Sequence, residues 1–360
     1  MPFGTILSKT KLIQHHTMKI CVLHPWRYKV RCMKRIGLLF LGSFVVFLIS
    51  REYIETLPSE PVLYQKNDFL FMKQWSNISP SPKLPTVKYQ HVGTLLQYNN
   101  KIWTEQPQNC YLKPGIYPEG ILKNSSNITV YVYNPEEDKW ISESILSHGE
   151  WKGNLSLQIN QMLLQDKRRV FIDIGAHLGV FSIPAAFTGT HVIAIDCVKE
   201  SLKRLCASVK RNKLLDRVTL IHNAVWRDNR YATLKVSPKN AGGVKVETVH
   251  EVRKPRGKTR EMVPTITLDN LLEMFNFSNV VIKMSVEGDE LTILQGAKRF
   301  FSIVRVDYLI IEFTNHRRKL SALQMRSLLH SYGMEPMVSD AMLKEKTYVR
   351  WPSTVVWRRI

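Results

Sequence analysis

Short apolar runs alternate with amphipathic segments through the C-terminal two thirds of the chain. Runs rich in β-branched and aromatic residues predict strands at 170–174, 191–196, 218–222, 279–285, 307–313, 334–339 and 353–358. Apolar positions at helical spacing predict helices that begin near 180 and span 200–212, 291–301 and 320–332. Thr267 is expected to cap a further helix, and residues 233–246 are expected to form a hairpin. This alternation indicates an α/β domain with a mostly parallel sheet, helices on both faces and right-handed crossovers.

The first of these strands runs into a glycine-containing turn and a helix start. Gly175 and Gly179 lack a Cβ atom, so the backbone can take a positive φ and a cofactor can lie against it. Asp173, at the end of the strand, is expected to face the ligand. The spacing D-x-G-x-x-x-G differs from the dinucleotide fingerprint G-x-G-x-x-G, because its first position is acidic and one glycine is missing. An acid suits a cationic ligand better than a pyrophosphate.

A second strand ends on Asp196, where an open α/β sheet needs a carboxylate for ribose hydroxyls. An adenosine with a cationic end fits both acids, which predicts S-adenosylmethionine. The alternative is an ordinary parallel-sheet turn whose glycines serve packing. Asn223, at the end of the third strand, is expected beside an adenine or, equally well, as a simple turn asparagine. Trp151, in an interruption of the helical pattern, is expected in the core.

The N-terminal part has a different pattern. The chain has 360 residues, 44% of them apolar, and a net charge of +21. Eight basic residues and no acid precede an uninterrupted apolar run, Ile36 to Ile49, and acids follow it. The positive-inside rule then predicts a type II signal anchor, with a cleaved signal peptide as the alternative. The expected parts are a cytosolic basic tail (1–35), a transmembrane helix (36–54), a lumenal stem (55–127) and a catalytic domain (128–360).

Glycosylation triplets and cysteines bear on the compartment. Five N-x-S/T triplets lie beyond the anchor, headed by Asn77, Asn124, Asn127, Asn154 and Asn276. The short apolar span suits the thinner membranes of the early secretory pathway, so we expect an endoplasmic reticulum or Golgi protein. Cys110, Cys197 and Cys206 would allow at most one lumenal disulfide. The cysteine and histidine spacings predict no metal site, and nucleic acid is not an expected partner.

A set of motifs makes the chain similar to a known family. They read V-F-I-D-I-G-A-H-L-G-V-F-S, A-I-D, H-N-A-V, K-N-A-G-G, T-L-D-N-L-L, V-I-K-M-S-V-E-G-D-E-L-T-I-L-Q-G-A and Y-L-I-I-E-F. Together they resemble the FkbM family of S-adenosylmethionine-dependent methyltransferases, over roughly Val130 to Ile360. The resemblance implies the Rossmann-like class I methyltransferase fold, a seven-stranded sheet with an antiparallel last strand. It also implies O-methyl transfer to hydroxyl groups such as those of sugars.

Carried over position by position, the resemblance implies two groups of site residues. The cofactor contacts would be Asp173, Gly175, His177, Gly179, Asp196 and Asn223. The strand-four signature contains Lys283, Glu287 and Glu290. The sequence departs from the family pattern at Ser285, where an aspartate is usual, and at His177, where an asparagine is frequent. The missing carboxylate at Ser285 leaves open a protein that keeps the fold without activity.

Methyl transfer to a hydroxyl needs an acceptor oxygen held close to the sulfonium and a nearby base. The candidates at strand ends are Glu287, Glu312 and His177, with Ser285 and Lys283 beside them. Glu287 could instead cap the following helix, and Glu312 could form an ion pair with Lys283 or an arginine. His177 is expected to line the loop rather than take the proton. The sequence thus predicts a membrane-anchored, lumenal O-methyltransferase acting on glycan hydroxyls, with an inactive relative or a nicotinamide-dependent oxidoreductase as alternatives.

Overall fold

The computed structural model describes residues 20–22, 31–33, 93–106, 117–123, 127–237, 239–249 and 262–360. The chain divides into two compact units, residues 1–76 and 77–360. In the first unit, β1 (Ile20–Val22) and β2 (Arg31–Met33) pair antiparallel. Within the described residues no helix is both long and apolar enough to cross a membrane, and the predicted anchor at 36–54 lies outside them.

A nine-stranded sheet organises the second unit. Its strands, in spatial order, are β16 (Met334–Pro336), β17 (Thr354–Arg359), β15 (Arg305–Glu312), β14 (Asn279–Met284), β7 (Arg169–Ile174), β8 (His191–Asp196), β9 (Val218–His222), β3 (Leu95–Asn99) and β4 (Ile102–Gln106). The pairs from β15 to β3 are parallel, whereas β17 runs antiparallel to both of its neighbours. The seven strands from β16 to β9 confirm the expected α/β sheet with its antiparallel last strand.

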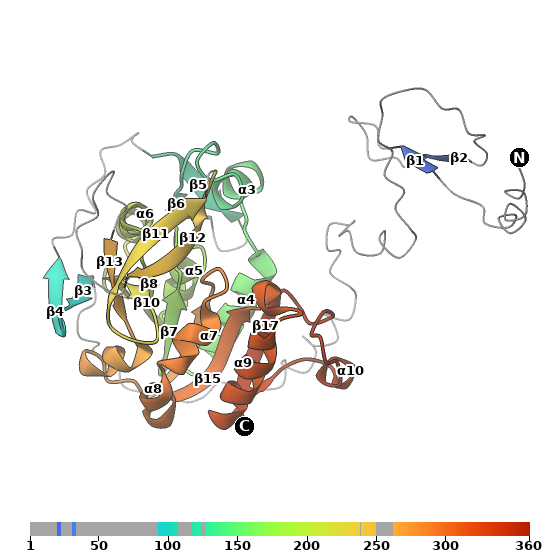
Figure 1. Cartoon of the computed structure of the whole chain (residues 1–360). Helices are drawn as coiled ribbons and strands as arrows, with labels where there is room; N and C mark the ends of the chain where they lie inside the picture. Colours follow the sequence, from blue (N-terminus) through green and yellow to red (C-terminus); the bar gives the residue numbers. More distant parts are fainter. Residues whose placement is uncertain are drawn as a thin grey trace, which may run out of the picture. The chain divides into compact units, whose positions relative to one another are not determined.

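Helices connect these strands. They are α3 (Ile141–His148), α4 (Gly153–Leu164), α5 (Ser182–Phe187), α6 (Lys199–Arg211), α7 (Glu290–Gln295), α8 (Lys298–Ile303), α9 (Leu320–Ser331) and α10 (Asp340–Leu343), with the 3-10 helices η2 (Leu268–Glu273) and η3 (Thr314–His316). Every residue of β8 and β14 is buried, as expected for parallel strands covered on both faces. One core cluster joins β14 and β15 to α7, α8 and α9, which Figure 1 draws in orange and red beside β15 and β17.

Smaller sheets flank the large one. β10 (Ala224–Val225), β13 (Met262–Ile266), β11 (Tyr231–Ser237) and β12 (Asn240–Val249) form a four-stranded sheet, in which β11 and β12 make the hairpin expected from the sequence. β5 (Glu119–Leu122) and β6 (Ile128–Tyr131) pair separately. The β11–β12 hairpin matters for the site, because its turn is tied by backbone hydrogen bonds to the segment before α3.

Three details differ from the expectations. The strands β3 and β4 fall in the predicted stem, yet β3 pairs with β9, so the folded domain begins before residue 128. The helix predicted at 291–301 is divided into α7 and α8 at Gly296, where an added Cβ would lie 2.5 Å from the Arg227 backbone. The segment after Thr267 is a 3-10 helix, although the predicted Thr267 cap is present and closes a capping box with Asn270.

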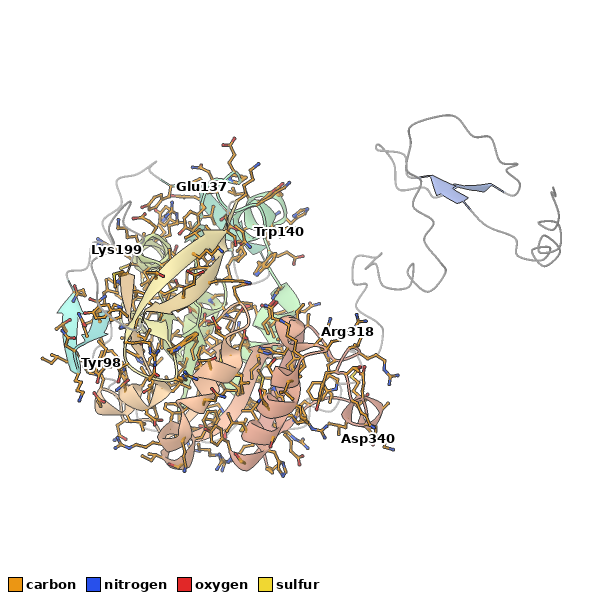
Figure 2. All side chains as sticks on the ribbon, viewed as in Figure 1. Tyr98, Glu137, Trp140, Lys199, Arg318 and Asp340 are labelled. Atoms are coloured by element: carbon orange, nitrogen blue, oxygen red, sulfur yellow. The ribbon has the colours of Figure 1, made fainter. Side chains whose placement is uncertain are left out.

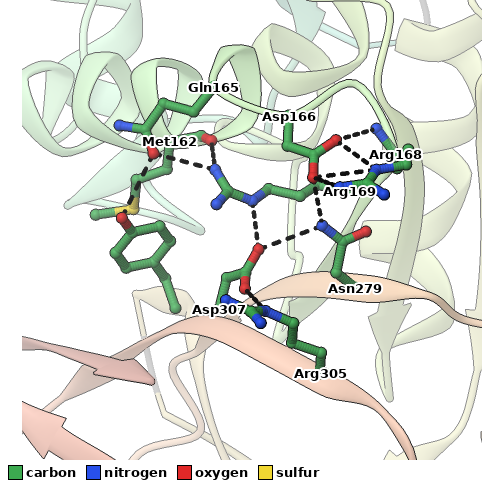
Figure 3. Close-up of polar contacts among 9 residues, drawn as sticks. Met162, Gln165, Asp166, Arg168, Arg169, Asn279, Arg305 and Asp307 are labelled. Atoms are coloured by element: carbon green, nitrogen blue, oxygen red, sulfur yellow. Dashed lines mark hydrogen bonds and ion pairs between the residues drawn. The ribbon is translucent and has the colours of Figure 1, made fainter. Parts of the chain in front are cut away.

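A polar network fixes the amino ends of the three central strands (Figure 3). Arg169, Asn279 and Arg305 are register partners at the starts of β7, β14 and β15. Asp307 accepts hydrogen bonds from Arg169 at 2.6 Å, from Arg305 at 2.7 Å and from Asn279 at 3.3 Å, while Asn279 also donates to Asp166 at 2.9 Å. Because the strands are parallel, this register also places their carboxyl ends together at the opposite edge of the sheet.

Candidate active site

Two adjoining cavities lie at the carboxyl ends of β7, β8, β14 and β15. The larger has a volume of about 270 Å³ and the smaller about 60 Å³. Both are lined by Gly175, His177, Gly242, Ser285 and Glu287, so a ligand could pass from one into the other. Ligands of open α/β sheets bind at this edge, outside the carboxyl ends of the strands. The two cavities therefore lie at the edge of the sheet where the sequence predicted a ligand.

The two glycines of the first loop have different tasks. Gly175 has φ of +74°, and an added Cβ would lie 2.1 Å from the Ser285 carbonyl oxygen, so the crossing from β7 past β14 requires glycine. Gly179, with φ of +78°, packs against Leu205 of α6, 2.2 Å from where its Cβ would be. Gly179 lines neither cavity. Glycine at this position therefore serves the packing of the loop against α6 rather than a direct contact with the cofactor.

Asp196 ends β8 and lines the smaller cavity. One carboxylate oxygen accepts a hydrogen bond from the His177 backbone N–H at 2.7 Å, and the other accepts one from the Val198 backbone N–H at 2.8 Å. Burial nevertheless raises the pKa of Asp196 to about 6. Each oxygen keeps a second lone pair, so the carboxylate can still accept two hydroxyl groups of a ribose.

His177 stands between the cavities. Its imidazole ring stacks on Tyr133, with ring centroids 5.6 Å apart and planes inclined by 11°. Within the described part of the chain, neither ring nitrogen has a hydrogen-bond partner, although the side chain is buried. Burial, helped by the nearby Lys283 and Arg204 charges, lowers the pKa of His177 to about 4. The ring is therefore neutral at pH 7 and offers one donor and one acceptor to a ligand.

Asp173 and Lys283 form a buried pair beneath the loop. The Asp173 carboxylate is fully buried, accepts a hydrogen bond from the Ser182 hydroxyl at 2.6 Å and lies 3.2 Å from the Lys283 ammonium. Lys283 also donates to the Gly175 carbonyl at 2.8 Å and lines the larger cavity. Asp173 lines neither cavity, so in this arrangement Lys283 stands between the acid and the ligand space.

The Asn223 side chain is committed to the protein itself. Its Oδ1 accepts from the Tyr98 backbone N–H at 2.9 Å, and its Nδ2 donates to the carbonyls of Tyr98 at 2.8 Å and Pro264 at 2.9 Å. These bonds tie β9 to β3 and β13. Asn223 does line the smaller cavity, but with its amide used in this way the structure corrects the expectation that its side chain reads an adenine.

A polar chain crosses the floor of the larger cavity. The Ser285 hydroxyl donates to the Glu312 carboxylate at 2.8 Å, and Lys152 donates to the same oxygen at 3.2 Å. Burial opposes ionisation of Glu312, but Lys152, the Ser285 hydroxyl and Lys283 together lower its pKa. The ion-pair partner of Glu312 is thus Lys152, rather than the Lys283 or arginine considered from the sequence.

Glu287 has a different environment. It sits in a turn with φ of +57°, followed by Gly288 at +107°, and borders both cavities. Burial, followed by repulsion from Glu312 and Glu290, raises its pKa. Glu290, not Glu287, caps this turn, because its carboxylate accepts from the Val286 N–H at 3.1 Å. The other Glu290 oxygen is 2.7 Å from the His316 imidazole, which holds the turn to the segment after β15.

Several lining residues were not predicted from the sequence as site residues. Trp140 and Trp151, at the two ends of α3, line the larger cavity, so Trp151 is not the core residue that was expected. Lys152 follows Trp151 in the same loop. The available signal was the sequence Gly149-Glu-Trp-Lys-Gly153, which interrupts two helical segments with glycines beside a tryptophan and a lysine. Asp289 lines the smaller cavity, and burial, with Glu290, raises its pKa to about 6.

The donor and acceptor groups of the smaller cavity fit an adenosine. Asp196 supplies the acceptor for a diol, and His177 supplies unused ring nitrogens where the cavities meet. Gly175 and Gly242 keep the backbone close on both sides, because a Cβ on Gly242 would lie 3.3 Å from the His177 ring. No lysine or arginine lines the smaller cavity among the described residues, so nothing there resembles a pyrophosphate site.

Comparison with known proteins agrees with this chemistry. Residues 173–336 match the family model "Methyltransferase FkbM domain". A search of curated proteins gave no significant match. Over these residues the chain is similar to FkbM-domain methyltransferases, which supports a methyltransferase with S-adenosylmethionine as the cofactor.

Solved methyltransferase structures match part of the chain at low sequence identity and low TM-score. A precorrin-6y C5,15-methyltransferase from Geobacter metallireducens is 16% identical, over 54% of this chain and 76% of that one, with a TM-score of 0.31. The magnesium protoporphyrin IX methyltransferase of Synechocystis, solved with bound S-adenosylmethionine, is 12% identical over 57% and 79%, with a TM-score of 0.32. At these scores the functional assignment rests on the domain match and the site.

Proposed function

We propose that this chain, whose residues 173–336 match the FkbM methyltransferase domain, is an O-methyltransferase of the secretory pathway that methylates glycan hydroxyls. One observation carries the proposal. A carboxylate with a raised pKa, Glu287, borders both the cavity that suits an adenosine and the larger cavity that remains for an acceptor. A base in that place can reach a hydroxyl group beside the reacting methyl.

The chain's residues divide the work of the reaction. When bound, S-adenosylmethionine supplies a methyl group already activated by its sulfonium. Asp196 binds the ribose hydroxyls, and the walls of the larger cavity hold the acceptor hydroxyl. A Glu287 oxygen accepts the hydroxyl proton as the oxygen–methyl bond forms and the sulfur–methyl bond breaks, with the neutral thioether as the leaving group. Such a base contributes a factor of about 10²–10⁴ in rate. The raised pKa makes Glu287 a stronger base than an exposed glutamate.

Glu312 is less suited to be the base. Its carboxylate is neutralised by Lys152 and accepts the Ser285 hydroxyl, and both interactions favour the ionised form and reduce its affinity for a proton. Two neighbouring carboxylates whose pKa values are shifted in opposite directions are typical of sites in which one carboxylate takes the proton and the other stays charged. Ser285 therefore orients the Glu312 carboxylate close to the position at which the FkbM family usually has an aspartate. This arrangement supports an active enzyme over an inactive relative.

Turnover of labelled S-adenosylmethionine on a panel of secretory-pathway glycans tests the proposal. Glu287→Gln should lower kcat by about 10² or more and leave cofactor affinity nearly unchanged, because the amide cannot accept the proton. Glu312→Gln is the matched control and should cost less. Equal kcat for wild type and Glu287→Gln would make the base assignment wrong. A wild type that binds cofactor and methylates nothing, but gains activity with Ser285→Asp, would favour the inactive relative.

The compartment is part of the proposal. Asn127, Asn154 and Asn276 are exposed, so these glycosylation triplets are accessible on the folded domain. Cys206 is disulfide-bonded, which suits an oxidising compartment. We expect the apolar run at 36–54 to anchor the chain in an endoplasmic reticulum or Golgi membrane, with the domain in the lumen.

Glycosidase treatment of the protein from eukaryotic cells should increase its gel mobility. Protease added to intact microsomes should spare the C-terminal domain. An unglycosylated domain that is digested in intact microsomes would overturn the orientation and, with it, the argument for glycan acceptors.

A further inference from the structure

Two indole side chains form the outer wall of the larger cavity. Trp140 precedes α3 and Trp151 lies in the loop after it, and both line the cavity together with Ile141. Trp140 is 61% exposed, an unusual state for so large an apolar side chain, and Figure 2 labels it at the start of α3. Trp151 is half-buried, with the Lys152 ammonium 5.8 Å from its ring centroid.

Another part of the cavity lining is polar. It is formed by Ser285 and Glu287 after β14, and by Glu312 at the end of β15, beside its register partner Thr354 on β17. All four side chains carry oxygen atoms that can bind hydroxyl groups. The two ammonium groups that line the cavity among the described residues, on Lys152 and Lys283, are already paired with Glu312 and Asp173. The cavity lining thus has an aromatic part and an oxygen-rich part.

The turn that carries Trp140 is held in place before any ligand binds. Asp138 is fully buried and accepts from the backbone N–H groups of Ile141 at 3.3 Å and Ser142 at 3.0 Å, which fixes the turn that carries Trp140. The Lys139 N–H donates to the Lys239 carbonyl at 3.0 Å, so the same turn is joined to the β11–β12 hairpin. A backbone turn that is already fixed loses little entropy on binding.

We propose that this cavity binds a neutral saccharide ring, with Trp151 against its apolar face and Glu287 and Glu312 at its hydroxyl groups. The inference rests on the proposed function and narrows its acceptor. A pyranose has C–H groups on its faces and hydroxyls at its edge, which matches one aromatic and one carboxylate wall. A uronate or sulfated ring would bring a further anion beside the carboxylates of Glu287 and Glu312. Lys152 and Lys283, whose ammonium groups line the cavity, are already paired with carboxylates.

Trp140 extends the same wall outward. Because most of its surface is open to solvent, it can contact a second sugar unit beyond the ring that receives the methyl group. The acceptor is therefore an oligosaccharide rather than a free monosaccharide, with Trp151 serving the reacting unit and Trp140 the adjoining one.

The test measures acceptor kinetics of the full-length protein in detergent. The probes are methyl glycosides of mannose, galactose, glucose and N-acetylglucosamine, their neutral trisaccharides, a glucuronate-containing trisaccharide, and 1-octanol as an alcohol without a sugar. Trp151→Ala should raise the KM for the best neutral trisaccharide by about tenfold or more, with kcat and cofactor affinity within about twofold. Trp151→Phe should restore most of the loss, because a ring face remains.

Trp140→Ala should raise the KM for the trisaccharide and leave that of the monosaccharide unchanged. Phe187→Ala is the control, because Phe187 is 49% exposed but lines neither cavity. Preference for 1-octanol or the glucuronate trisaccharide, or an unchanged KM in Trp151→Ala, would overturn the saccharide inference while leaving methyl transfer intact.

If none of the probes is methylated, the proposed methyl transfer to glycans is wrong. Measurement of saccharide binding then tests the saccharide site independently of methyl transfer. Ligand-observed NMR should show the neutral trisaccharide bound to wild type and to Phe187→Ala, and released in Trp151→Ala. Absence of binding to wild type would overturn the saccharide site as well.

Discussion

Asp196 is predicted to lower the stability of the free protein while it binds the cofactor. Its folded-state pKa of about 6 lies above the ordinary value of 3.8, so between these values the native state holds more protons than the unfolded state. The free energy of unfolding therefore falls as the pH rises from about 4 to about 6 and stays lower above that. The difference corresponds to about 3 kcal/mol at pH 7.

Asp196→Asn removes this cost but also removes one of the two acceptors for the His177 and Val198 N–H groups, a loss of about 1–3 kcal/mol. The two effects nearly cancel, so the variant should fold with a Tm equal to or above that of wild type at pH 7. Its affinity for S-adenosylmethionine should nevertheless fall by about tenfold or more, because each charge-assisted bond to the ribose contributes about 1.5–3 kcal/mol.

Titration calorimetry between pH 5 and pH 8 gives a second readout. If the ionised Asp196 is the binding form, the wild-type affinity at pH 5 should be about tenfold lower than at pH 7. The pKa of Asp289 lies in the same range, so Asp289 could also make the affinity depend on pH. Only the part of the pH dependence of affinity that is lost in Asp196→Asn is due to Asp196. The exposed Asp216→Asn is the control. An Asp196→Asn variant that binds normally, or a wild-type affinity that is constant with pH, would refute the reasoning.

Three further predictions concern the floor of the site. Gly175→Ala should lower Tm strongly and abolish cofactor binding, because its Cβ would lie 2.1 Å from the Ser285 carbonyl oxygen. Gly189→Ala is the control for backbone strain alone, since Gly189 has φ of +87° and its Cβ would meet no atom closer than 3.9 Å. An equal loss of Tm in both variants would contradict the clash. Lys152→Met should raise the pKa of Glu312 and also that of Glu287, because the Lys152 charge lowers both, and should move the acidic limb of the pH–rate profile upward. An acidic limb that does not move would contradict a role of these two carboxylates in the rate. Ser285→Asp should change kcat only modestly, and calorimetry should show cofactor affinity preserved; activity that appears only in this variant would contradict the role given to the serine.

The sheet could be predicted from the sequence because its strands are buried on both faces. A continuous apolar run such as Val280 to Ile282 has few alternatives, and the acids and glycines at the strand ends mark the ligand edge. The strands β3 and β4 could not be predicted, because neither has a strong apolar pattern. β3 pairs with β9 at only a few register positions, and β4 is largely exposed.

The partners of polar side chains could not be read from the sequence. Asn223 and Asp173 lie at strand ends as expected, but their hydrogen bonds depend on where β3, β13 and Lys283 fall in space. The cavity wall formed by Trp140 and Trp151 likewise depends on how α3 is set over strand ends far along the chain. The position of a residue on a strand can be predicted from its neighbours in the sequence. The surroundings of its side chain depend on segments that are distant in the sequence.

Methyl transfer from labelled S-adenosylmethionine to neutral trisaccharides, compared between wild type and Glu287→Gln, tests the account most directly. We predict label in the sugar product with wild type, and a kcat lower by about 10² or more in Glu287→Gln at unchanged cofactor affinity. Wild-type protein that binds S-adenosylmethionine but leaves every saccharide unlabelled, or a variant that turns over as fast as wild type, would contradict it.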